Sequence, residues 1–265
     1  TTYYIKLASS TDNGLNWTSR TVTSSSAYTL VYPTIAIDSS NNLYVAYRGY
    51  RSISTLSKIW LNKISSGTIN SPVEVDAYSN DSGIISLLLD SNNIYLSYHY
   101  NESSNRKPML VTSSISSISF STSSIPAGTG YYSDNGNRLL IDGSSNLYNF
   151  GIITTSSVRR LIYQKFNGSS WTNETIVNSG QITYQFSCST LLNNNIVCYG
   201  FDSTNGLYKT TYNGSSWSAT SSVLTDNSAY SYGREINSSI DQSNNLYISY
   251  TNQGISTSTV TLVKD

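Results

Sequence analysis

Apolar and polar positions in this chain alternate in short runs, and the runs come in pairs. The apolar run "PTIAI" (33–37) leads into a polar turn, and the alternating run "LYVAY" (43–47) follows that turn. Alternation over four to eight residues is typical of a half-buried β-strand, and a turn rich in Asn, Asp and Ser between two such runs indicates a hairpin. No run of the sequence has a helical period. The pattern therefore predicts an all-β protein.

The hairpin pattern recurs along the chain at intervals of about fifty residues. The copies are "PTIAIDSSNNLYVAYRG" (33–49), "ISLLLDSNNIYLSYHY" (85–100), "RLLIDGSSNLYNFGI" (138–152), "CSTLLNNNIVCYGF" (188–201) and "NSSIDQSNNLYISYTN" (237–252). A third strand-like run follows each hairpin, and a shorter fourth run follows most of them. Four antiparallel strands per repeat are the pattern of a β-propeller blade.

The repeats predict one propeller domain over residues 1–265. The repeats lie near 33–83, 84–136, 137–184 and 185–235, and a closing blade combines 236–265 with 1–32. The N-terminal run matches the third and fourth strands of a blade and the C-terminal run matches the first three, so the two ends would close the ring and leave no exposed edge. Five blades are favoured. The ends supply one strand more than five blades need, which keeps six blades as the alternative.

An aspartate opens the turn in four of the five repeats, at Asp38, Asp90, Asp142 and Asp241, and Asn193 falls in the remaining interval. A carboxylate at this place can accept hydrogen bonds from the backbone of its own turn. We therefore assign these aspartates a structural role rather than a catalytic one.

The charge composition excludes some classes of partner. Charged residues make up 11% of the chain, and 15 basic residues balance 15 acidic ones. A nucleic-acid partner would need a basic surface, and no apolar run approaches the length of about 18 to 20 residues that spans a bilayer. We expect neither a nucleic-acid partner nor a membrane span. A first residue of Thr1 rather than Met is compatible with removal of a signal peptide or propeptide.

Two cysteines and seven glycosylation sequons bear on the cellular setting. Cys188 and Cys198 lie symmetrically about Asn193, which would place them opposite each other across a hairpin. A cross-strand disulfide fits this spacing, with two buried thiols as the alternative. The sequons are Asn16, Asn80, Asn101, Asn167, Asn173, Asn213 and Asn237, although a chain rich in Asn and Ser produces sequons by chance. Together these features favour a secreted or cell-surface glycoprotein.

The stretch "SSTDNGLNWTS" (9–19) carries a resemblance to a known family. Its Ser10, Asp12, Gly14 and Trp17 resemble the Asp-box of the sialidase-like, BNR-repeat β-propellers. The resemblance implies a structural turn in which the aspartate ties backbone amides, the glycine takes a conformation closed to other residues, and the aromatic ring packs beneath the turn. Asn16 stands where Thr or Ser is usual, and the related turns "FNGSSWT" (166–172) and "YNGSSWS" (212–218) lack the aspartate.

The resemblance does not extend to a sialidase active site. Sialidases hold the substrate carboxylate with three arginines, the first in an Arg-Ile-Pro motif that this chain lacks. The nearest candidates are Arg48, Arg138 and Arg234, with Glu235 nearby. We therefore expect a non-catalytic member of this family. A propeller glycosidase would instead need carboxylates separated by about 5 to 9 Å, and the weak candidates for that role are Glu235 and Asp134.

Other chemistry finds little support. His99 is the single histidine of the chain, and no Ser/His/Asp order, Cys/His pair or zinc-ligand spacing can be built around it. We expect it in a loop or at the rim. We expect no cofactor, while oxygen-rich turns such as "TDNG" and "SDNG" leave Ca²⁺ open.

Sorting the loops by their place in the repeat separates two faces. The loops after the second strand and between repeats hold seven of the eight arginines and many tyrosines. Aromatic rings with a hydroxyl edge and planar guanidinium groups suit sugar rings, acidic groups or a protein partner. The alternative is that the tyrosines fill space between blades and the arginines are solvated. The candidate ligand-binding residues are Arg48, Tyr50, Arg51, His99, Tyr100, Arg106, Tyr131, Tyr132, Arg138, Tyr232 and Arg234.

The favoured function is recognition of a ligand through this Tyr/Arg-rich face by an extracellular propeller, in the manner of an adhesin or lectin. Carbohydrate is the favoured ligand, as a free glycan or on a cell-surface glycoprotein. One alternative is a propeller glycoside hydrolase. Another is a structural subunit of a surface layer, filament or virion, in which a terminal strand completes the sheet of another copy.

Overall fold

The computed structural model describes residues 1–264 with internal gaps at 53–54, 79–83, 103–104, 126–130, 173–174, 178–181, 183–184, 203–205, 226–235, 242 and 254–257. The side chains of some strand residues beside these gaps also lie outside the described part. The described residues form strands and turns, which confirms the all-β class. They contain no helix that could cross a membrane.

The chain divides into two compact units, and each is described by itself. Unit 1 contains residues 1–104 and 109–124, and unit 2 contains residues 105–108 and 125–265.

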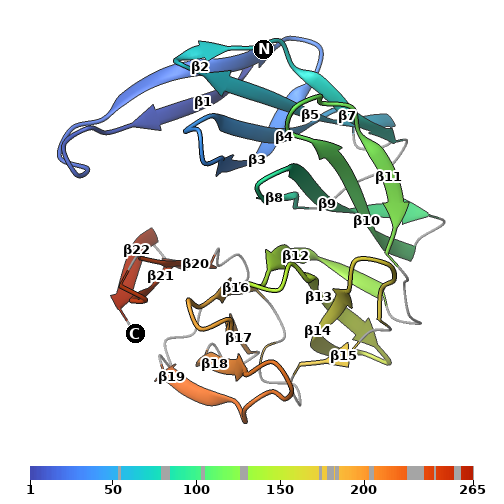
Figure 1. The fold of residues 1–265 in the computed structure, drawn as a ribbon, viewed down its shortest axis with the longest axis vertical. Helices are drawn as coiled ribbons and strands as arrows, with labels where there is room; N and C mark the ends of the chain where they lie inside the picture. Colours follow the sequence, from blue (N-terminus) through green and yellow to red (C-terminus); the bar gives the residue numbers. More distant parts are fainter. Residues whose placement is uncertain are drawn as a thin grey trace. The chain divides into compact units, whose positions relative to one another are not determined.

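The strands of unit 1 build three antiparallel sheets (Figure 1). The N-terminal pair β1–β2 stands as its own sheet, and β3 to β7 and then β8 to β11 form the next two. The strands are β1 (Tyr3–Ser9), β2 (Thr18–Ser25), β3 (Thr29–Ile37), β4 (Leu43–Ser52), β5 (Thr55–Ser65), β6 (Thr68–Ile69), β7 (Val73–Tyr78), β8 (Ser86–Leu89), β9 (Asn93–Glu102), β10 (Asn105–Ser114) and β11 (Ser121–Ser124). The first strand of one sheet, β3, contacts the first strand of the next, β8.

Unit 2 repeats this plan in two four-stranded sheets and one three-stranded sheet. Its strands are β12 (Tyr131–Ile141), β13 (Leu147–Thr155), β14 (Val158–Phe166), β15 (Thr175–Ile176), β16 (Phe186–Thr190), β17 (Ile196–Phe201), β18 (Gly206–Tyr212), β19 (Ser221–Thr225), β20 (Ile236–Ile240), β21 (Leu246–Gln253) and β22 (Ser258–Lys264). The first strand of the middle sheet, β16, contacts β12 on one side and β20 on the other. Figure 1 shows the later strands of the first two sheets lying farther from these three first strands.

Neighbouring sheets within each unit pack face to face through alternate side chains. In unit 2, Phe150 and Ile152 of β13 share a buried cluster with Phe186 and Ile196 of the next sheet. In unit 1, Ala46, Ile59 and Leu61 meet Ile94, Leu96 and Tyr98 in the same way. Because side chains along a strand alternate between its two faces, a strand buried on both faces can serve two such interfaces at once. Four-stranded antiparallel sheets stacked in this way are the arrangement of propeller blades.

The chain ends do not form one shared sheet among the described strands. There, β1 pairs with β2, whereas β20, β21 and β22 make a separate three-stranded sheet. The N-terminal pair instead contributes Ile5 and Val22 to a cluster with Val45, Tyr47 and Ile64 of the following sheet. The closing blade and the number of blades stay predictions.

Hydrogen bonds confirm the structural role of the repeated aspartates. Asp38 Oδ1 accepts from the backbone N–H groups of Ser40 and Asn42, both at 2.9 Å, and Oδ2 accepts from Asn42 Nδ2 at 2.8 Å and from the Tyr44 hydroxyl at 3.1 Å. Asp142 and Asp241 repeat this set of bonds, and Asp90 has a version shortened by one residue. Burial raises the pKa of Asp38, but these hydrogen bonds outweigh it, and the pKa lies below its ordinary value.

The turn at Ser10 to Trp17 is closed by its own side chains. Asp12 Oδ1 accepts from Asn16 N–H at 2.8 Å, Ser10 Oγ accepts from Gly14 N–H at 2.8 Å, and Gly14 has φ of +88°. The bond from the Asn16 amide is the main reason that the pKa of Asp12 falls to about 2. Trp17 differs from the aromatic that the resemblance implies: it is 62% exposed, and its Nε1 donates to Gly14 O at 2.9 Å.

Candidate functional site

The three first strands of unit 2 bring together a group of polar side chains, which we name the inner-strand cluster. It consists of Arg138 on β12, Ser187 and Ser189 on β16, and Asn237 and Ser238 on β20. These strands come from three different sheets and are joined here by side chains rather than by backbone pairing.

Arg138 is the charged member of this cluster. Its Nη2 donates to Ser187 Oγ at 2.6 Å and to Asn237 Oδ1 at 3.3 Å. It lies opposite Phe150 in the strand pairing, on the face of its sheet that packs toward β16. Burial lowers the pKa of Arg138, but the ordinary value for arginine is so high that the group stays a cation.

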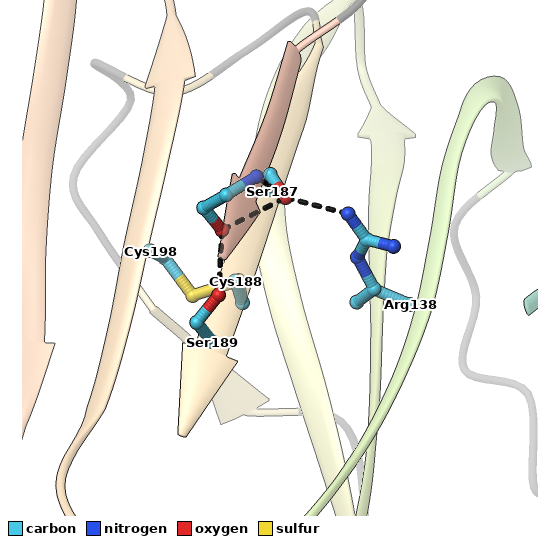
Figure 2. Close-up of a disulfide and its surroundings, with 6 residues drawn as sticks. Arg138, Ser187, Cys188, Ser189 and Cys198 are labelled. Carbon is cyan, nitrogen blue, oxygen red and sulfur yellow. Dashed lines mark hydrogen bonds between the residues drawn. A yellow bond between two sulfur atoms is a disulfide. The ribbon is translucent and has the colours of Figure 1, made fainter. Parts of the chain in front are cut away.

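The hydroxyl groups of the cluster form a short chain. Ser187 Oγ, which is fully buried, also accepts from Ser238 N–H at 2.9 Å and from Ser238 Oγ at 3.0 Å. Ser238 Oγ lies 2.7 Å from Ser189 Oγ. Figure 2 shows the Arg138 guanidinium reaching Ser187 with one nitrogen while its other nitrogens point away.

The disulfide predicted from the sequence lies next to this cluster, on the same strand as two of its serines. Cys188 and Cys198 are directly opposite each other on β16 and β17 and form a bond of 2.01 Å. Cys188 lies between Ser187 and Ser189 along the strand, so the serines leave one face of β16 while the disulfide packs on the other (Figure 2). Both cysteines are buried in the core that includes Phe150 and Phe186.

Unit 1 contains a second group of cations and aromatic rings, at the end of β4. Arg48 is buried, its Nη2 donates to Ser57 Oγ at 3.0 Å, and its guanidinium lies 5.4 Å from the centre of the Tyr50 ring. The exposed Arg51 lies 4.8 Å from the ring centre of Tyr28. These contacts are cation–π packing and give both arginines structural partners. The burial of Arg48 differs from the solvated arginines of the alternative in the sequence analysis.

Several candidate residues lie on strands rather than on the loops expected for them. Strand β4 ends at Ser52 and β5 begins at Thr55, and these two residues pair with each other, so the candidates at positions 48, 50 and 51 lie within β4. His99 and Tyr100 lie within β9. The reason is that backbone pairing continues past the apolar runs that marked the strands in the sequence. His99 is buried rather than placed at the rim.

The remaining sequence-predicted residues fall into three groups. Arg106, Tyr131, Tyr132 and Asp134 lie in strands β10 and β12, but their side chains, like that of Tyr100, are outside the described part. Tyr232, Arg234 and Glu235 lie outside the described residues altogether. Among the sequons, Asn16, Asn167, Asn213 and Asn237 are described, Asn101 is a strand residue of β9 without a described side chain, and Asn80 and Asn173 lie outside.

Sequence reasoning missed the inner-strand cluster, although the repeat carries a signal for Ser187 and Asn237, the two partners of Arg138. Arg138, Ser187 and Asn237 each lie four residues before the residue that opens the turn of their repeat, namely Asp142, Leu191 and Asp241. Residues at the same repeat position lie at the same level along adjacent first strands, so their side chains can meet. At this position the repeats of unit 2 hold an arginine, a serine and an asparagine.

The chain resembles solved structures of carbohydrate-active propeller proteins. It matches Trypanosoma rangeli sialidase in complex with the inhibitor DANA at 11% identity and a TM-score of 0.65, covering 98% of this chain and 50% of that one. It matches the GH93 α-L-arabinofuranosidase of Fusarium graminearum with arabinobiose at 11% identity and a TM-score of 0.66, covering 99% and 85%. An ulvan lyase of polysaccharide lyase family PL25, bound to -[GlcA(1-4)Rha3S]-, matches at 12% identity and a TM-score of 0.63, covering 92% and 66%.

These likenesses show the fold, a sialidase-like propeller, at identities too low to carry an activity. The chain spans half the length of the sialidase and about two thirds of that of the lyase. No family model matches the sequence, and no curated protein matches it.

Proposed function

We propose that this protein is an extracellular propeller that binds an acidic carbohydrate at the inner-strand cluster of unit 2. The observation that carries the proposal is the bonding of Arg138. Its two hydrogen bonds, both from Nη2, go to neutral oxygens. Among the described residues no carboxylate forms an ion pair with it, and none contributes to the shift of its pKa.

Arg138 has N–H donors that a ligand could use. Nε and Nη1 together carry three N–H donors, and within the described part of the chain they have no hydrogen-bond partner. Partial burial removes solvation from the charge, and a carboxylate or sulfate at these donors would restore it. The neighbouring Asn237 side chain, which is exposed, suits the hydroxyl groups of a sugar ring.

The shared fold supports carbohydrate as the ligand, because the solved structures that it matches include an arabinofuranosidase with arabinobiose and a lyase bound to an acidic saccharide, -[GlcA(1-4)Rha3S]-. The Tyr/Arg-rich residues of the sequence analysis would supply further contacts, as in a lectin or adhesin. The disulfide supports a secreted or cell-surface location. We further propose five blades, with the strands of the two chain ends completing the fifth.

Calorimetry with an oligogalacturonate and with its methyl ester tests the proposal, because the ester removes the charge and keeps the sugar. We expect the acid to bind and the ester to bind at least about tenfold more weakly, since a charge-assisted hydrogen bond contributes about 1.5–3 kcal/mol. Arg138→Met should abolish this difference. Arg20→Met is the matched control, because Arg20 bonds Gly67 O in unit 1. Equal binding of acid and ester would contradict the proposal. A sulfated galactan oligosaccharide in parallel distinguishes sulfate from carboxylate recognition.

Cleavage of a polysaccharide is a second candidate function, which rests on the two carboxylates that the sequence analysis kept for it. Asp134 belongs to β12, and Glu235, the residue before β20 in the sequence, lies outside the described residues. Release of reducing ends, or of unsaturated uronides detected by ultraviolet absorbance, would establish it, and Asp134→Asn and Glu235→Gln should then lower the rate. Absence of both binding and turnover across a glycan panel would favour the structural-subunit alternative.

A further inference from the structure

The buried hydroxyl of Ser187 is the fixed point of the inner-strand cluster. It accepts from Arg138 Nη2, from Ser238 N–H and from Ser238 Oγ, at 2.6, 2.9 and 3.0 Å. A hydroxyl oxygen has two lone pairs, so three donors around it leave no acceptor capacity for a ligand. Because Ser187 is also fully buried, it is unsuited to contact a ligand directly.

The surroundings of Ser187 restrict its movement on two sides. On β16, the next residue is tied to the facing strand by the Cys188–Cys198 disulfide. Across the first strands, Ser238 holds Ser187 through a backbone and a side-chain bond, and Ser189 contacts Ser238 Oγ at 2.7 Å. Since both cysteines are buried, the disulfide is a permanent brace and not an accessible redox group.

Arg138 depends on this fixed point. Without Ser187, its remaining hydrogen bond is the 3.3 Å contact to Asn237, which is exposed. An arginine held by one long contact to an exposed side chain would sample several rotamers, and a ligand would have to order it again on binding.

We propose that Ser187 is a positioning residue, whose hydroxyl holds the Arg138 guanidinium so that Nε and Nη1 face the acidic group of the ligand. This inference rests on the proposed function, because it names the residue that prepares the same site. Ser187 acts through Arg138 and does not itself touch the ligand.

Ser187→Ala tests this inference by its effect on two probes. Ordering one long side chain costs about 0.5–1.5 kcal/mol, so the affinity for oligogalacturonate should fall about three- to tenfold. The affinity for the methyl ester should stay within about twofold, because that probe gains little from the charge of Arg138. Ser222→Ala is the matched control in the same unit, since Ser222 is an exposed serine on β19, opposite Tyr208 and outside the inner-strand cluster. Equal loss for both probes would mean a general structural role and would overturn the inference.

A double-mutant cycle adds a second test. In the Arg138→Met background, Ser187→Ala should leave the affinity for the acid unchanged, because the group that it positions is gone. An undiminished effect in that background would also overturn the inference. Ser238→Ala, which keeps the backbone bond to Ser187, should give a smaller selective loss and serves if Ser187→Ala does not fold.

One measurement separates this inference from the proposed function. In the free protein labelled with ¹⁵N-arginine, the Arg138 Nε–H signal should report an ordered side chain that loosens in Ser187→Ala and not in Ser222→Ala. If no probe binds the wild-type protein, the proposed function fails while this signal still decides the positioning role. An equally mobile Arg138 in all three proteins would overturn that role.

Discussion

At the scale of single residues, the hydrogen bonding of Arg138 differs from that of the repeat aspartates. In the repeat aspartates, both carboxylate oxygens accept hydrogen bonds within their own turn, as in Asp38, so they are not free to act on a ligand. Among the described residues, Arg138 uses one guanidinium nitrogen, Nη2, in hydrogen bonds, and its other two nitrogens have no partner. This difference in hydrogen bonding, rather than residue type, is what marks Arg138 as a site residue.

Gly143→Ala should destabilise unit 2 because Gly143 meets a side chain of the next repeat. A Cβ atom there would lie 2.4 Å from Asn194 Oδ1, which accepts from Gly143 N–H at 3.0 Å. We expect a loss of about 1–3 kcal/mol in the free energy of unfolding, measured in urea. Asn194→Gly, which removes the bond without a clash and suits the φ of +66° at that position, should cost less. A Gly143→Ala protein as stable as the wild type would show that the two turns do not meet.

At the scale of elements, the repeat hairpins could be predicted from the sequence, whereas the inner-strand cluster could not. The Asp turn and the symmetric cysteines are local features, so spacing alone placed Asp142 and paired Cys188 with Cys198. The bond from Arg138 to Ser187 joins residues 49 apart, on strands of different sheets. Alternation of polar and apolar residues says which face of a strand is buried but not which side chain of another sheet it meets.

The disulfide should stabilise the β16–β17 hairpin mainly by restricting the unfolded chain. Cys188 and Cys198 are separated by 10 residues, and closing a loop of this size contributes about 2.5–3 kcal/mol in the chain-entropy model. The double variant Cys188→Ala/Cys198→Ala should lose about that much free energy of unfolding, and Cys188→Ala alone should lose no less. A loss below about 0.5 kcal/mol in the double variant would contradict this role.

The Asp turns should make the protein sensitive to acid. The pKa of Asp142 is raised by burial and lowered more strongly by hydrogen bonds from Asn146, Tyr148 and Ser144, so it lies below its unfolded value. A group with a depressed pKa contributes stability above its unfolded pKa of about 4, and that contribution is lost as pH falls through the folded pKa. The melting temperature should therefore fall from about pH 4 downward.

Asp142→Asn tests the assignment of this acid effect to the turn. The variant should be less stable than the wild type at neutral pH and should lose less stability on acidification. Parallel curves for the two proteins between about pH 5 and pH 2 would mean that Asp142 does not contribute to the acid effect.

At the scale of the whole molecule, the balance of 15 basic and 15 acidic residues shapes the expected binding. A protein without net charge does not steer an acidic ligand from a distance, so selectivity must come from contacts at close range. The fold could be predicted from the repeats, and the likeness to solved propellers agrees with it. Blade closure could not be derived in this way, because it depends on which strands meet at the two ends of the chain.

Binding through one partly buried arginine should depend weakly on salt. Raising the ionic strength from about 0.05 to 0.5 M should reduce the affinity for oligogalacturonate less than about tenfold, because a partly buried pair is screened less than an exposed one. Calorimetry across this range measures the effect. A fall of a hundredfold or more would indicate many surface cations and would argue against a site centred on Arg138.

The central claim is tested most directly by a crystal structure of the protein with an acidic oligosaccharide to which it binds in solution. We predict that the carboxylate or sulfate lies within hydrogen-bond distance of Arg138 Nε or Nη1, with Ser187 still bonded to Nη2. A ligand seated away from β12, β16 and β20, or one whose acidic group faces solvent, would contradict the account.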